Sequence, residues 1–385
     1  MQAVTFQGNK NVEVKDVPAP TIHKPDDIIV KITTTAICGS DLHLIHDMIP
    51  NLPQNYIIGH EPMGVVEEVG PEVTKLKKGN RVIIPFNVSC GECFYCKHDL
   101  TSQCDNSNPH GGMGGFFGYS ETAGGYPGGQ AEYMRVPYGN FTPFKIPENS
   151  EVEDEKLVLL ADAMATAFWS AENSGVKKGD TVVVLGCGPI GLLAQKFCWM
   201  MGAKRVIAVD YIDYRLDHAK KYNTVEIVNF EQHENTGEYL KEITQGGADI
   251  VIDAVGMDGK MTPLEFLASG LKLQGGALGS FVIASQAVRK GGMIQVTGAY
   301  GSRYNSFPLG DLMNRNINLR MGQAPVIPYM PRLYQMLADK RFDPSDIITH
   351  NIPLDQAKHG YEVFDTKTDG CIKVVLHPGG KGYLH

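Results

Sequence analysis

The sequence lacks an excess of basic residues, and it lacks long hydrophobic runs. Its 385 residues include 35 Lys and Arg against 43 Asp and Glu, which gives a formal net charge of −8 at pH 7. This balance provides no electrostatic basis for binding nucleic acid or an anionic membrane, so neither is expected as a partner. No apolar run approaches the roughly eighteen residues that a membrane-spanning helix needs.

The start of the sequence lacks the basic-then-apolar plan of a signal peptide, because MQAVTFQGNKNVEVKD alternates like a strand. We therefore expect a cytoplasmic, reducing location, where clustered cysteines are metal ligands more often than disulfides. The chain also lacks internal repeats. Its length exceeds that of one ordinary hydrophobic core, so two domains are expected, one of which can split the other.

Four of the eight cysteines lie close together in the pattern C-x2-C-x2-C-x7-C. They are Cys90, Cys93, Cys96 and Cys104. Four thiolates this close can converge on one tetrahedral zinc ion and leave no open position for a substrate, which is the geometry of a structural site. We expect this lobe, at about residues 88–106, to stabilise a loop and to do no chemistry.

Three other interpretations of the four cysteines fit the sequence less well. Disulfides are disfavoured by the reducing compartment. An iron–sulfur cluster can also begin with C-x2-C-x2-C, but the spacing to Cys104 departs from the C-x3-C-P run of ferredoxins. A nucleic-acid-binding zinc module is disfavoured by the acidic charge balance.

Two segments upstream carry a second set of residues with metal-site chemistry. They are AICGSDLHLIHD, with Cys38, Ser40, Asp41 and His43, and IIGHEPMGVVEEVG, with His60 and Glu61. Gly59 and Gly64 allow the backbone to turn sharply around the imidazole of His60. A cysteine, a histidine and one carboxylate make a three-ligand site with a fourth position open, which is the pattern of catalytic zinc.

The segment TVVVLGCGPIG predicts a buried parallel strand that ends in a dinucleotide-binding turn. Its glycines are Gly186, Gly188 and Gly191, and an apolar helix, LLAQKFCWMMG, follows them. The next strand, RVIAVD, ends at Asp210, which would bind the ribose hydroxyls and repel a 2′-phosphate. This favours NAD over NADP, although the nearby Arg215 leaves NADP open.

With the motifs CGSDLH and GHEPMGVVEEVG, the cysteine lobe and the dinucleotide turn, the chain resembles the zinc-dependent medium-chain alcohol dehydrogenases over nearly its whole length. The resemblance implies an α/β fold in which a GroES-like β-barrel catalytic domain is split around a Rossmann domain with a doubly wound parallel sheet. The expected boundaries are residues 1–160 and 325–385 for the catalytic domain and 161–324 for the NAD-binding domain, with the active site in the cleft between them.

The resemblance also implies roles for the residues of the two upstream segments. Cys38 and His60 would bind the catalytic zinc, and Asp41 would orient His60. Glu61 would lie beside the metal and ligate it transiently.

Two further sets of residues take their roles from the resemblance. Ser40 and His43 would pass the proton of the alcohol to solvent. Lys373 stands where family members carry a basic residue that reaches the cofactor pyrophosphate, and an exposed strand lysine is the open alternative. Cys187, Cys198 and Cys371 are given no function, because small buried thiols are common.

The third ligand of the catalytic zinc departs from the best-known members, which have a cysteine there. The corresponding stretch, LVLLADAMATAFWSA, contains no cysteine, and Asp162 is its only carboxylate, so Asp162 is the expected third ligand. Glutathione-independent formaldehyde dehydrogenases are known for the same substitution. A carboxylate is harder than a thiolate and should leave the metal a stronger Lewis acid. The alternative is that Asp162 caps the following helix.

Two segments are unusual for the family. The glycine-rich stretch 110–130 is expected to be a loop, and it resembles the corresponding region of glutathione-independent formaldehyde dehydrogenases. Residues 257–292 are expected to form a long insertion before the fifth Rossmann strand. In that subfamily an insertion hereabouts covers the adenine end of the cofactor and retains it, whereas a flexible surface loop is the alternative.

The expected reaction is reversible transfer of a hydride from a zinc-bound alcohol to NAD, giving an aldehyde or ketone, with two zinc ions per chain. A formaldehyde dehydrogenase or dismutase with tightly held NAD is the alternative, and polyol or threonine oxidation ranks below it. A non-enzymatic zinc protein is the alternative from another class. A small alcohol or aldehyde is the expected partner, and a homo-oligomer is expected, with a tetramer favoured.

Overall fold

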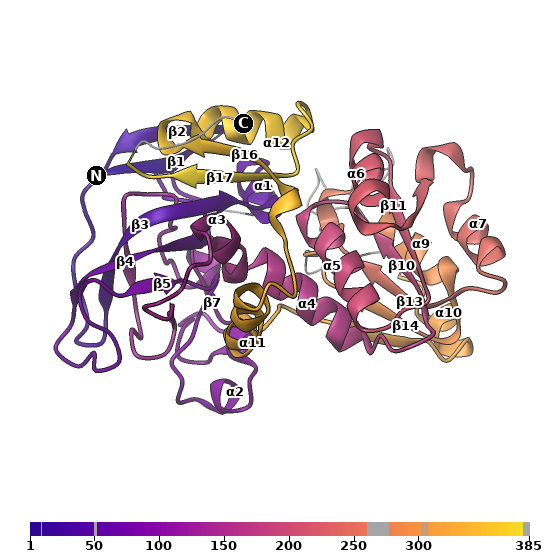
Figure 1. The fold of residues 1–385 in the computed structure, drawn as a ribbon, viewed down its shortest axis with the longest axis horizontal. Helices are drawn as coiled ribbons and strands as arrows, with labels where there is room; N and C mark the ends of the chain where they lie inside the picture. Colours follow the sequence, from indigo (N-terminus) through magenta and orange to yellow (C-terminus); the bar gives the residue numbers. More distant parts are fainter. Residues whose placement is uncertain (9, 50–51, 260–276, 302–303, 305–306, 380–385) are drawn as a thin grey trace. The chain divides into compact units, whose positions relative to one another are not determined.

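A computed structural model describes residues 1–8, 10–49, 52–259, 277–301, 304 and 307–379 of the chain. The chain divides into two compact units (Figure 1). Unit 1 comprises Met1–Ala165 and Pro325–His385, and unit 2 comprises Thr166–Ala324. Within the described ranges, no helix combines the length and the apolar composition that crossing a bilayer requires.

Unit 1 is built on a seven-stranded sheet with the order β16-β17-β3-β4-β5-β9, in which β8 also pairs with β3. Its strands are β3 (Ile28–Ile37), β4 (Glu61–Val69), β5 (Arg81–Ile83), β8 (Tyr133–Val136), β9 (Phe144–Lys145), β16 (Ile348–Pro353) and β17 (Lys373–His377). The sequence of β3, IIVKITTTAI, is rich in β-branched residues, which favour strands. It pairs antiparallel with β4, β8 and β17 and so forms the centre of the unit.

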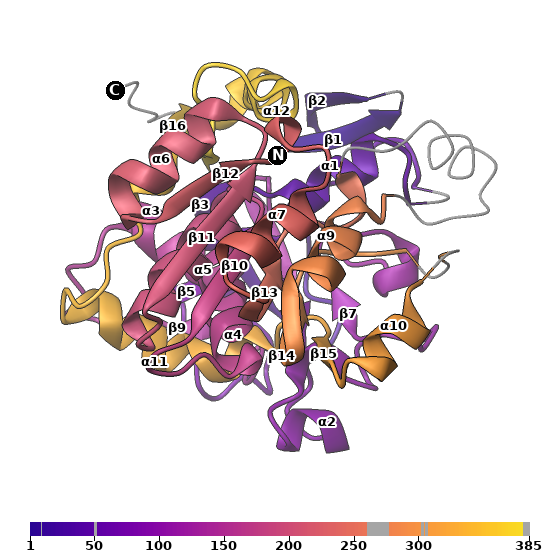
Figure 2. The same ribbon diagram turned by 90° about the vertical axis from the view of Figure 1, so that its right-hand side faces the viewer.

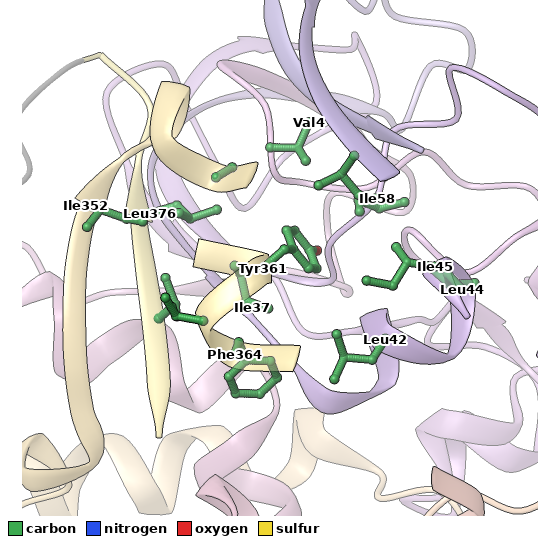
Figure 3. Close-up of a cluster of buried hydrophobic side chains, with 14 of the residues drawn as sticks. Val4, Ile37, Leu42, Leu44, Ile45, Ile58, Ile352, Tyr361, Phe364 and Leu376 are labelled. Atoms are coloured by element: carbon green, nitrogen blue, oxygen red, sulfur yellow. The ribbon is translucent and has the colours of Figure 1, made fainter. Parts of the chain in front are cut away.

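The C-terminal segment completes the sheet that the N-terminal segment begins. Figure 1 shows β17, from the end of the chain, beside β3, from its beginning, and the register pairs Val375 with Ala36. Figure 3 shows the apolar cluster that this pairing creates, in which Val4 and Ile58 lie with Tyr361 and Leu376. The core of unit 1 therefore draws on residues from both ends of the sequence.

Unit 1 contains further strands and helices outside this sheet. They are β1 (Gln2–Gly8), β2 (Asn11–Asp16), α1 (Gly39–Ile45), β6 (Asn87–Val88), α2 (Phe94–Lys97), β7 (Gly115–Phe116), α3 (Asp154–Leu157), α11 (Val326–Ala338) and α12 (Ala357–Thr366). The 3₁₀ turns are η1 (Thr101–Gln103), η2 (Glu121–Ala123), η3 (Val158–Ala161), η6 (Ser345–Ile347) and η7 (Leu354–Gln356). Helix α4 (Ala163–Ser174) carries the chain from unit 1 into unit 2.

Unit 2 is a six-stranded parallel sheet with the order β12-β11-β10-β13-β14-β15 (Figure 2). Its strands are β10 (Thr181–Leu185), β11 (Arg205–Asp210), β12 (Glu226–Asn229), β13 (Ala248–Asp253), β14 (Val288–Val296) and β15 (Asn318–Met321). In sequence order this is 3-2-1-4-5-6, the doubly wound order of dinucleotide-binding sheets. The predicted α/β fold with a Rossmann-type sheet is confirmed.

Helices cover both faces of this sheet. They are α5 (Pro189–Met200), α6 (Asp213–Asn223), α7 (Thr236–Ile243), α9 (Gly279–Ala287) and α10 (Leu309–Asn314), with the 3₁₀ turns η4 (Phe230–Gln232) and η5 (Gly256–Asp258). Every residue of β10 is buried, as expected for a strand that is covered on both sides. Figure 1 shows α5 and α9 on opposite faces.

The prediction that residues 257–292 form an insertion before the fifth Rossmann strand is wrong at its C-terminal end. Residues 279–287 form helix α9, which packs on the sheet, and β14 begins at Val288. Residues 260–276 of the predicted cofactor-covering segment lie outside the described residues.

Candidate metal and cofactor sites

Four buried side chains of unit 1 bring metal-binding atoms together. They are Cys38, His60, Glu61 and Asp162, each of which offers one ligand atom within 4.8 Å of the others. Cys38 immediately precedes α1, Glu61 begins β4, and Asp162 lies between η3 and α4. The structure thus brings together the three predicted ligands, Cys38, His60 and Asp162, and Glu61, the predicted neighbour of the metal.

The metal-binding atoms of this group lie close to one another, as expected of atoms that could bind one ion. The Sγ atom of Cys38 lies 3.5 Å from Oδ2 of Asp162, and Nε2 of His60 lies 3.4 Å from the same oxygen. The hydroxyl of Ser40 lies 3.4 Å from Sγ of Cys38 and 3.2 Å from Nε2 of His60. The hydroxyl of Ser40 therefore lies beside the metal-binding atoms of Cys38 and His60.

Asp41 holds His60 from behind. One oxygen of its carboxylate, Oδ1, lies 3.0 Å from Nδ1 of His60, and the other, Oδ2, accepts the backbone N–H of Cys38 at 3.0 Å. Asp41 is fully buried. A carboxylate at Nδ1 favours the tautomer in which this nitrogen carries the proton, which leaves Nε2 to bind a metal.

The charges of the group repel one another strongly. Burial raises the pKa of the Cys38 thiol, and the charges of Glu61 and Asp162 raise it further. Burial also raises the pKa of Glu61, to about 7, although Lys373 opposes this shift. A divalent cation among these atoms would reverse the balance, because it stabilises the thiolate and the carboxylates together.

Glu61 is held on one side only. Its Oε2 forms an ion pair with Lys373, whereas its Oε1 is buried without a hydrogen-bond partner in the structure. An orphaned carboxylate oxygen beside a thiolate, an imidazole and a second carboxylate is the arrangement that a metal ion would satisfy. The donor set of sulfur, nitrogen and oxygen fits zinc.

The cysteine lobe forms the second candidate metal site. Its ligand atoms come from Cys90, Cys93, Cys96 and Cys104. The Sγ atoms of Cys90 and Cys96 are 4.0 Å apart, and those of Cys93 and Cys104 are 3.9 Å apart. Zn–S bonds of about 2.3 Å in a tetrahedron place sulfurs about 3.8 Å apart, so the four thiols have the spacing of a zinc site.

Hydrogen bonds to sulfur prepare this lobe for a cation. Cys90 Sγ accepts the backbone N–H of Cys93 and the side-chain amide of Asn106, each at 3.3 Å. Burial raises the pKa of Cys93, but hydrogen bonds from the backbone of Cys96 and Asp105 outweigh it and lower the pKa to about 7. Thiolates stabilised in this way bind metal more readily.

The glycine-rich stretch 110–130 is a loop with only short elements, as expected, and it packs against the first metal group. Phe116 from this loop lies edge-on to Phe86, with ring centroids 5.2 Å apart, and Phe86 in turn faces His60. Gly118 is required here, because a Cβ at this position would lie 2.5 Å from the carbonyl oxygen of Gly59. The loop is therefore linked to His60 through Phe86, which lies between Phe116 and the imidazole.

Tyr119 from the same loop contacts the predicted proton relay. Its hydroxyl lies 3.2 Å from Nδ1 of His43, which is buried on α1. Burial raises the pKa of Tyr119, so its hydroxyl keeps its proton. Sequence reasoning missed this residue, because a single tyrosine in a glycine-rich loop has no spacing that marks it.

The dinucleotide turn of unit 2 is closely packed. A Cβ on Gly191 would lie 1.9 Å from the carbonyl oxygen of Gly186, and Gly186 itself has φ +91°. Helix α5 starts directly after Gly188, so the backbone N–H groups at its first turn are available to a phosphate. These are the features that the motif predicts, and they lie at the carboxyl end of β10.

Asp210 and Arg215 both lie at this turn. Asp210 ends β11, and its Oδ2 accepts the backbone N–H of Cys187 at 2.7 Å, while Oδ1 accepts that of Tyr211 at 2.7 Å. Nη1 of Arg215 would lie 3.9 Å from a Cβ on Gly188. Asp210 therefore also supports the turn, a role that the sequence did not reveal.

Two protein-family models match the chain, one in each unit. The model for the alcohol dehydrogenase GroES-like domain matches residues 24–148, and the model for the zinc-binding dehydrogenase family matches residues 189–272. The first match confirms the predicted GroES-like domain.

Whole-chain relatives are similar along nearly the full length. The chain is 70% identical over 378 residues to the uncharacterized zinc-type alcohol dehydrogenase-like protein AdhB of Bacillus subtilis (strain 168), covering 98% of this chain and 100% of that protein. It is 31% identical over 411 residues to the glutathione-independent formaldehyde dehydrogenase of the same organism, covering 98% and 97%. Among solved structures, alcohol dehydrogenase TADH from Thermus sp. ATN1 matches with a TM-score of 0.84 and 33% identity, covering 98% and 100%.

Proposed function

Because the chain belongs to the zinc-type alcohol dehydrogenase family of oxidoreductases, we propose that it oxidises a small alcohol reversibly to an aldehyde or ketone, with NAD as hydride acceptor and two zinc ions per chain. The observation that carries the proposal is the convergence of Cys38, His60 and Asp162 around the hydroxyl of Ser40. Three metal donors beside a serine hydroxyl suit a reaction in which a hydroxyl group loses its proton.

Cys38, His60 and Asp162 would hold the catalytic zinc, and Glu61 would stand beside it. Zinc supplies a Lewis acid that lowers the pKa of a hydroxyl group towards neutrality. Asp41 keeps the proton of His60 on Nδ1, so Nε2 presents its lone pair to the metal. Asp162 contributes a harder donor than the family cysteine.

Ser40 and His43 would carry the proton away. Ser40 lies among the donor atoms, where it can accept the proton of the substrate hydroxyl. His43 is on the same helix, α1, and its Nδ1 is fixed by the hydroxyl of Tyr119. A histidine held in one orientation is suited to pass a proton on. The hydride chemistry itself belongs to the nicotinamide cofactor.

The preference for NAD rests on Asp210. Its carboxylate ends β11 beside the glycine turn, where it would accept hydrogen bonds from ribose hydroxyls and repel a 2′-phosphate. Arg215 beside Gly188 is the group that would favour NADP instead. A contact of Lys373 with the cofactor pyrophosphate is also proposed, and the family resemblance is its only basis.

The second candidate is a formaldehyde dehydrogenase or dismutase that retains its NAD. Similarity to the glutathione-independent formaldehyde dehydrogenase of B. subtilis, over 98% of this chain, favours it. The presence of Asp162 in place of a cysteine also favours it. Polyol or threonine oxidation and a non-enzymatic role have no specific observation behind them.

One experiment separates these functions. The zinc-loaded protein is mixed with excess NAD and a panel of alcohols and formaldehyde, while NADH absorbance and the products are followed. Steady NADH release with alcohols supports the proposed dehydrogenase. Conversion of formaldehyde to methanol and formate without free NADH supports the dismutase. No reaction with any substrate, from protein that holds both zinc ions, would contradict both.

Assembly into a homo-oligomer is also proposed, because large apolar side chains are exposed on unit 2. The preference for a tetramer comes from the family resemblance alone. Leu309, Met313 and Met321, which lie on α10 and the edge strand β15, are 68%, 70% and 59% exposed. An exposed edge strand with apolar neighbours favours pairing with another chain. Light scattering of the purified protein measures the mass and tests this directly.

A further inference from the structure

Behind His60 lies a chain of buried polar groups that the proposed function does not use. Asp41, which holds His60, is contacted by Gln130, and Gln130 is contacted by Tyr361 of α12. Gln130 and Asp41 are fully buried, and Tyr361 is 3% exposed. The chain therefore runs from the last helix of the molecule to a predicted metal ligand without reaching solvent.

Hydrogen bonds join Tyr361 to Gln130 and Gln130 to Asp41, and a close pairing of charged atoms joins Asp41 to His60. The hydroxyl of Tyr361 donates to Oε1 of Gln130 at 2.8 Å. Nε2 of Gln130 donates to the carbonyl oxygen of Ala36 at 3.1 Å and to Oδ2 of Asp41 at 3.3 Å. Oδ1 of Asp41 then lies 3.0 Å from Nδ1 of His60.

The amide of Gln130 can take only one orientation in this environment. If it were flipped, its oxygen would face the carbonyl oxygen of Ala36 and the carboxylate of Asp41, both of which are acceptors. The hydroxyl of Tyr361, which donates, fixes the correct orientation from the other side. Burial raises the pKa of Tyr361 well above its ordinary value, so this donor keeps its proton.

The ring of Tyr361 lies in apolar surroundings. Figure 3 shows its ring among the apolar side chains of Ile37, Ile58 and Ile45, which belong to one core cluster of unit 1. A hydroxyl placed in such a cluster is costly unless it is hydrogen-bonded. A phenylalanine would fill the same space at no such cost, so the hydroxyl has a use.

The backbone beside His60 is shaped to admit Gln130. Gly59 has φ +90°, and a Cβ at this position would lie 2.2 Å from Cγ of Gln130. The glycine that precedes His60 therefore serves the close passage of this side chain as well as the turn of the backbone. Any larger residue at position 59 would displace Gln130 from Asp41.

We infer that Gln130 and Tyr361 are positioning residues for the catalytic metal centre, acting on His60 through Asp41. With the hydrogen bond from Gln130 and that from the backbone of Cys38, Oδ2 of Asp41 is held in place. Oδ1 is then directed at Nδ1 of His60, which fixes the ring and its tautomer. The inference rests on the proposed zinc ion at Cys38, His60 and Asp162.

The test measures release of zinc from the full-length, zinc-loaded protein to a chromophoric chelator. Tyr361→Phe removes one hydroxyl and keeps the ring. The catalytic zinc should leave about 3- to 10-fold faster than from the wild type, less than the 10- to 100-fold typical of a residue in direct contact with a ligand. The zinc of the cysteine lobe should leave at the unchanged rate, and it serves as an internal reference. A Cys38→Ser protein, which lacks the catalytic zinc, assigns the two phases.

Tyr56→Phe is the matched control. Tyr56 packs against the same core cluster as Tyr361, and its hydroxyl also donates one hydrogen bond, to the carbonyl oxygen of Tyr126 at 2.7 Å. Tyr56 is not part of the series of contacts that runs from Tyr361 through Gln130 and Asp41 to His60. Faster release from Tyr361→Phe but not from Tyr56→Phe supports the inference.

A second variant and a spectrum guard against a protein that simply folds poorly. Gln130→Glu keeps the shape of the side chain and removes the donor to Asp41, so it should also accelerate release of the catalytic zinc alone. With Co²⁺ in the catalytic site, both variants should shift the visible absorption bands, which report ligand geometry.

The outcomes separate the inference from the function on which it rests. Unchanged release and an unchanged Co²⁺ spectrum in both variants, from protein with two zinc ions per chain, would overturn the inference alone. A wild-type protein that binds one zinc ion per chain would overturn the proposed centre and the inference with it.

Discussion

Lys373 and Glu61 form an ion pair in which both side chains are completely buried. They begin the strands β17 and β4, which lie on either side of β3. Burial lowers the pKa of Lys373, but the charges of Glu61 and Cys38 outweigh this effect and raise it. The interpretation of Lys373 as an exposed strand lysine is therefore wrong, while its predicted contact with the cofactor stays a prediction.

Removal of the lysine charge should destabilise the protein strongly. Lys373→Met leaves the carboxylate of Glu61 buried without its partner, which costs about 3 to 5 kcal/mol in the free energy of unfolding. Urea denaturation of both proteins measures the difference. Lys78→Met is the control, because Lys78 pairs with Glu67 on the surface, where solvent screens the pair and its loss should cost little. Equal costs for the two variants would contradict the importance of the buried pair.

The third ligand can be tested by counting zinc. Asp162→Ala and Cys38→Ser should each reduce the zinc content from two ions per chain to one and abolish turnover, because each removes a donor from an open site. Elemental analysis and the NADH assay provide the two readouts. Cys93→Ser is the matched control, which should lose the other zinc ion and lower stability. An Asp162→Ala protein with both zinc ions and full turnover would exclude Asp162 as a ligand.

The hydroxyl of Tyr119 should matter for proton release. Tyr119→Phe removes the group that fixes His43, so kcat should fall about tenfold, a fraction of the 10²- to 10⁴-fold typical of acid–base groups. A pH-indicator dye and NADH absorbance, followed together before the steady state, show whether proton release lags behind hydride transfer. Tyr126→Phe is the control, because Tyr126 lies in the same loop but its hydroxyl donates to the carbonyl oxygen of Ser107. If both variants behave alike, the hydroxyl of Tyr119 serves only the loop.

Coenzyme choice should depend on Asp210. Asp210→Ser removes the charge that would repel a 2′-phosphate, so the ratio of kcat/KM with NAD to that with NADP should fall at least about tenfold. The same change removes an acceptor from the backbone of Cys187, so affinity for both coenzymes should also decrease. Steady-state kinetics with each coenzyme separates the two effects. A constant ratio would remove Asp210 from ribose recognition.

Stability in acid should depend on Asp249. Burial raises the pKa of Asp249, but the backbone N–H of Thr181 and the guanidinium of Arg289 outweigh it, so the pKa lies below its ordinary value. A carboxyl with a lowered folded-state pKa stabilises the fold above its unfolded pKa of about 3.9, and this contribution disappears as the pH falls through the lower folded value.

Thermal unfolding across pH tests this expectation. At pH 7, Asp249→Asn should cost about 1 to 2 kcal/mol, and the difference from the wild type should shrink below about pH 4. Asp311→Asn is the control, because Asp311 also pairs with an arginine, Arg315, but is 56% exposed. A difference for Asp249→Asn that is constant from pH 7 to pH 3 would contradict the argument.

The candidate ligands could be predicted because they sit in short, recognisable segments. Cys38, Ser40, Asp41 and His43 share one helical turn and its approach, and His60 and Glu61 are adjacent. The alternation of apolar strands with helices and the spacing of three glycines were also sufficient to predict the parallel sheet of unit 2. Helix α9 was missed, because its sequence, GSFVIASQA, is short and its polar residues are spread around the helix, so it has no 3.6-residue pattern.

The supporting residues could not be predicted, because their partners are remote in sequence. Tyr361 lies 231 positions from Gln130, and Lys373 lies 312 positions from Glu61. Neither pair has a spacing or a motif, and only the pairing of β17 with β3 brings the elements together. Sequence patterns report local periodicity, whereas these contacts depend on how distant strands pack.

The placement of β17 and α12 beside β3 has a consequence for biosynthesis. A chain emerges from the ribosome from its N-terminus, and domains tend to fold as they appear. Unit 2 is continuous and can fold while translation is in progress, but unit 1 must wait for Tyr361 and Lys373. The metal-binding group of Cys38 and His60 is therefore completed among the last steps of folding, so premature termination near the end of the message would yield a folded unit 2 and an unfinished metal site.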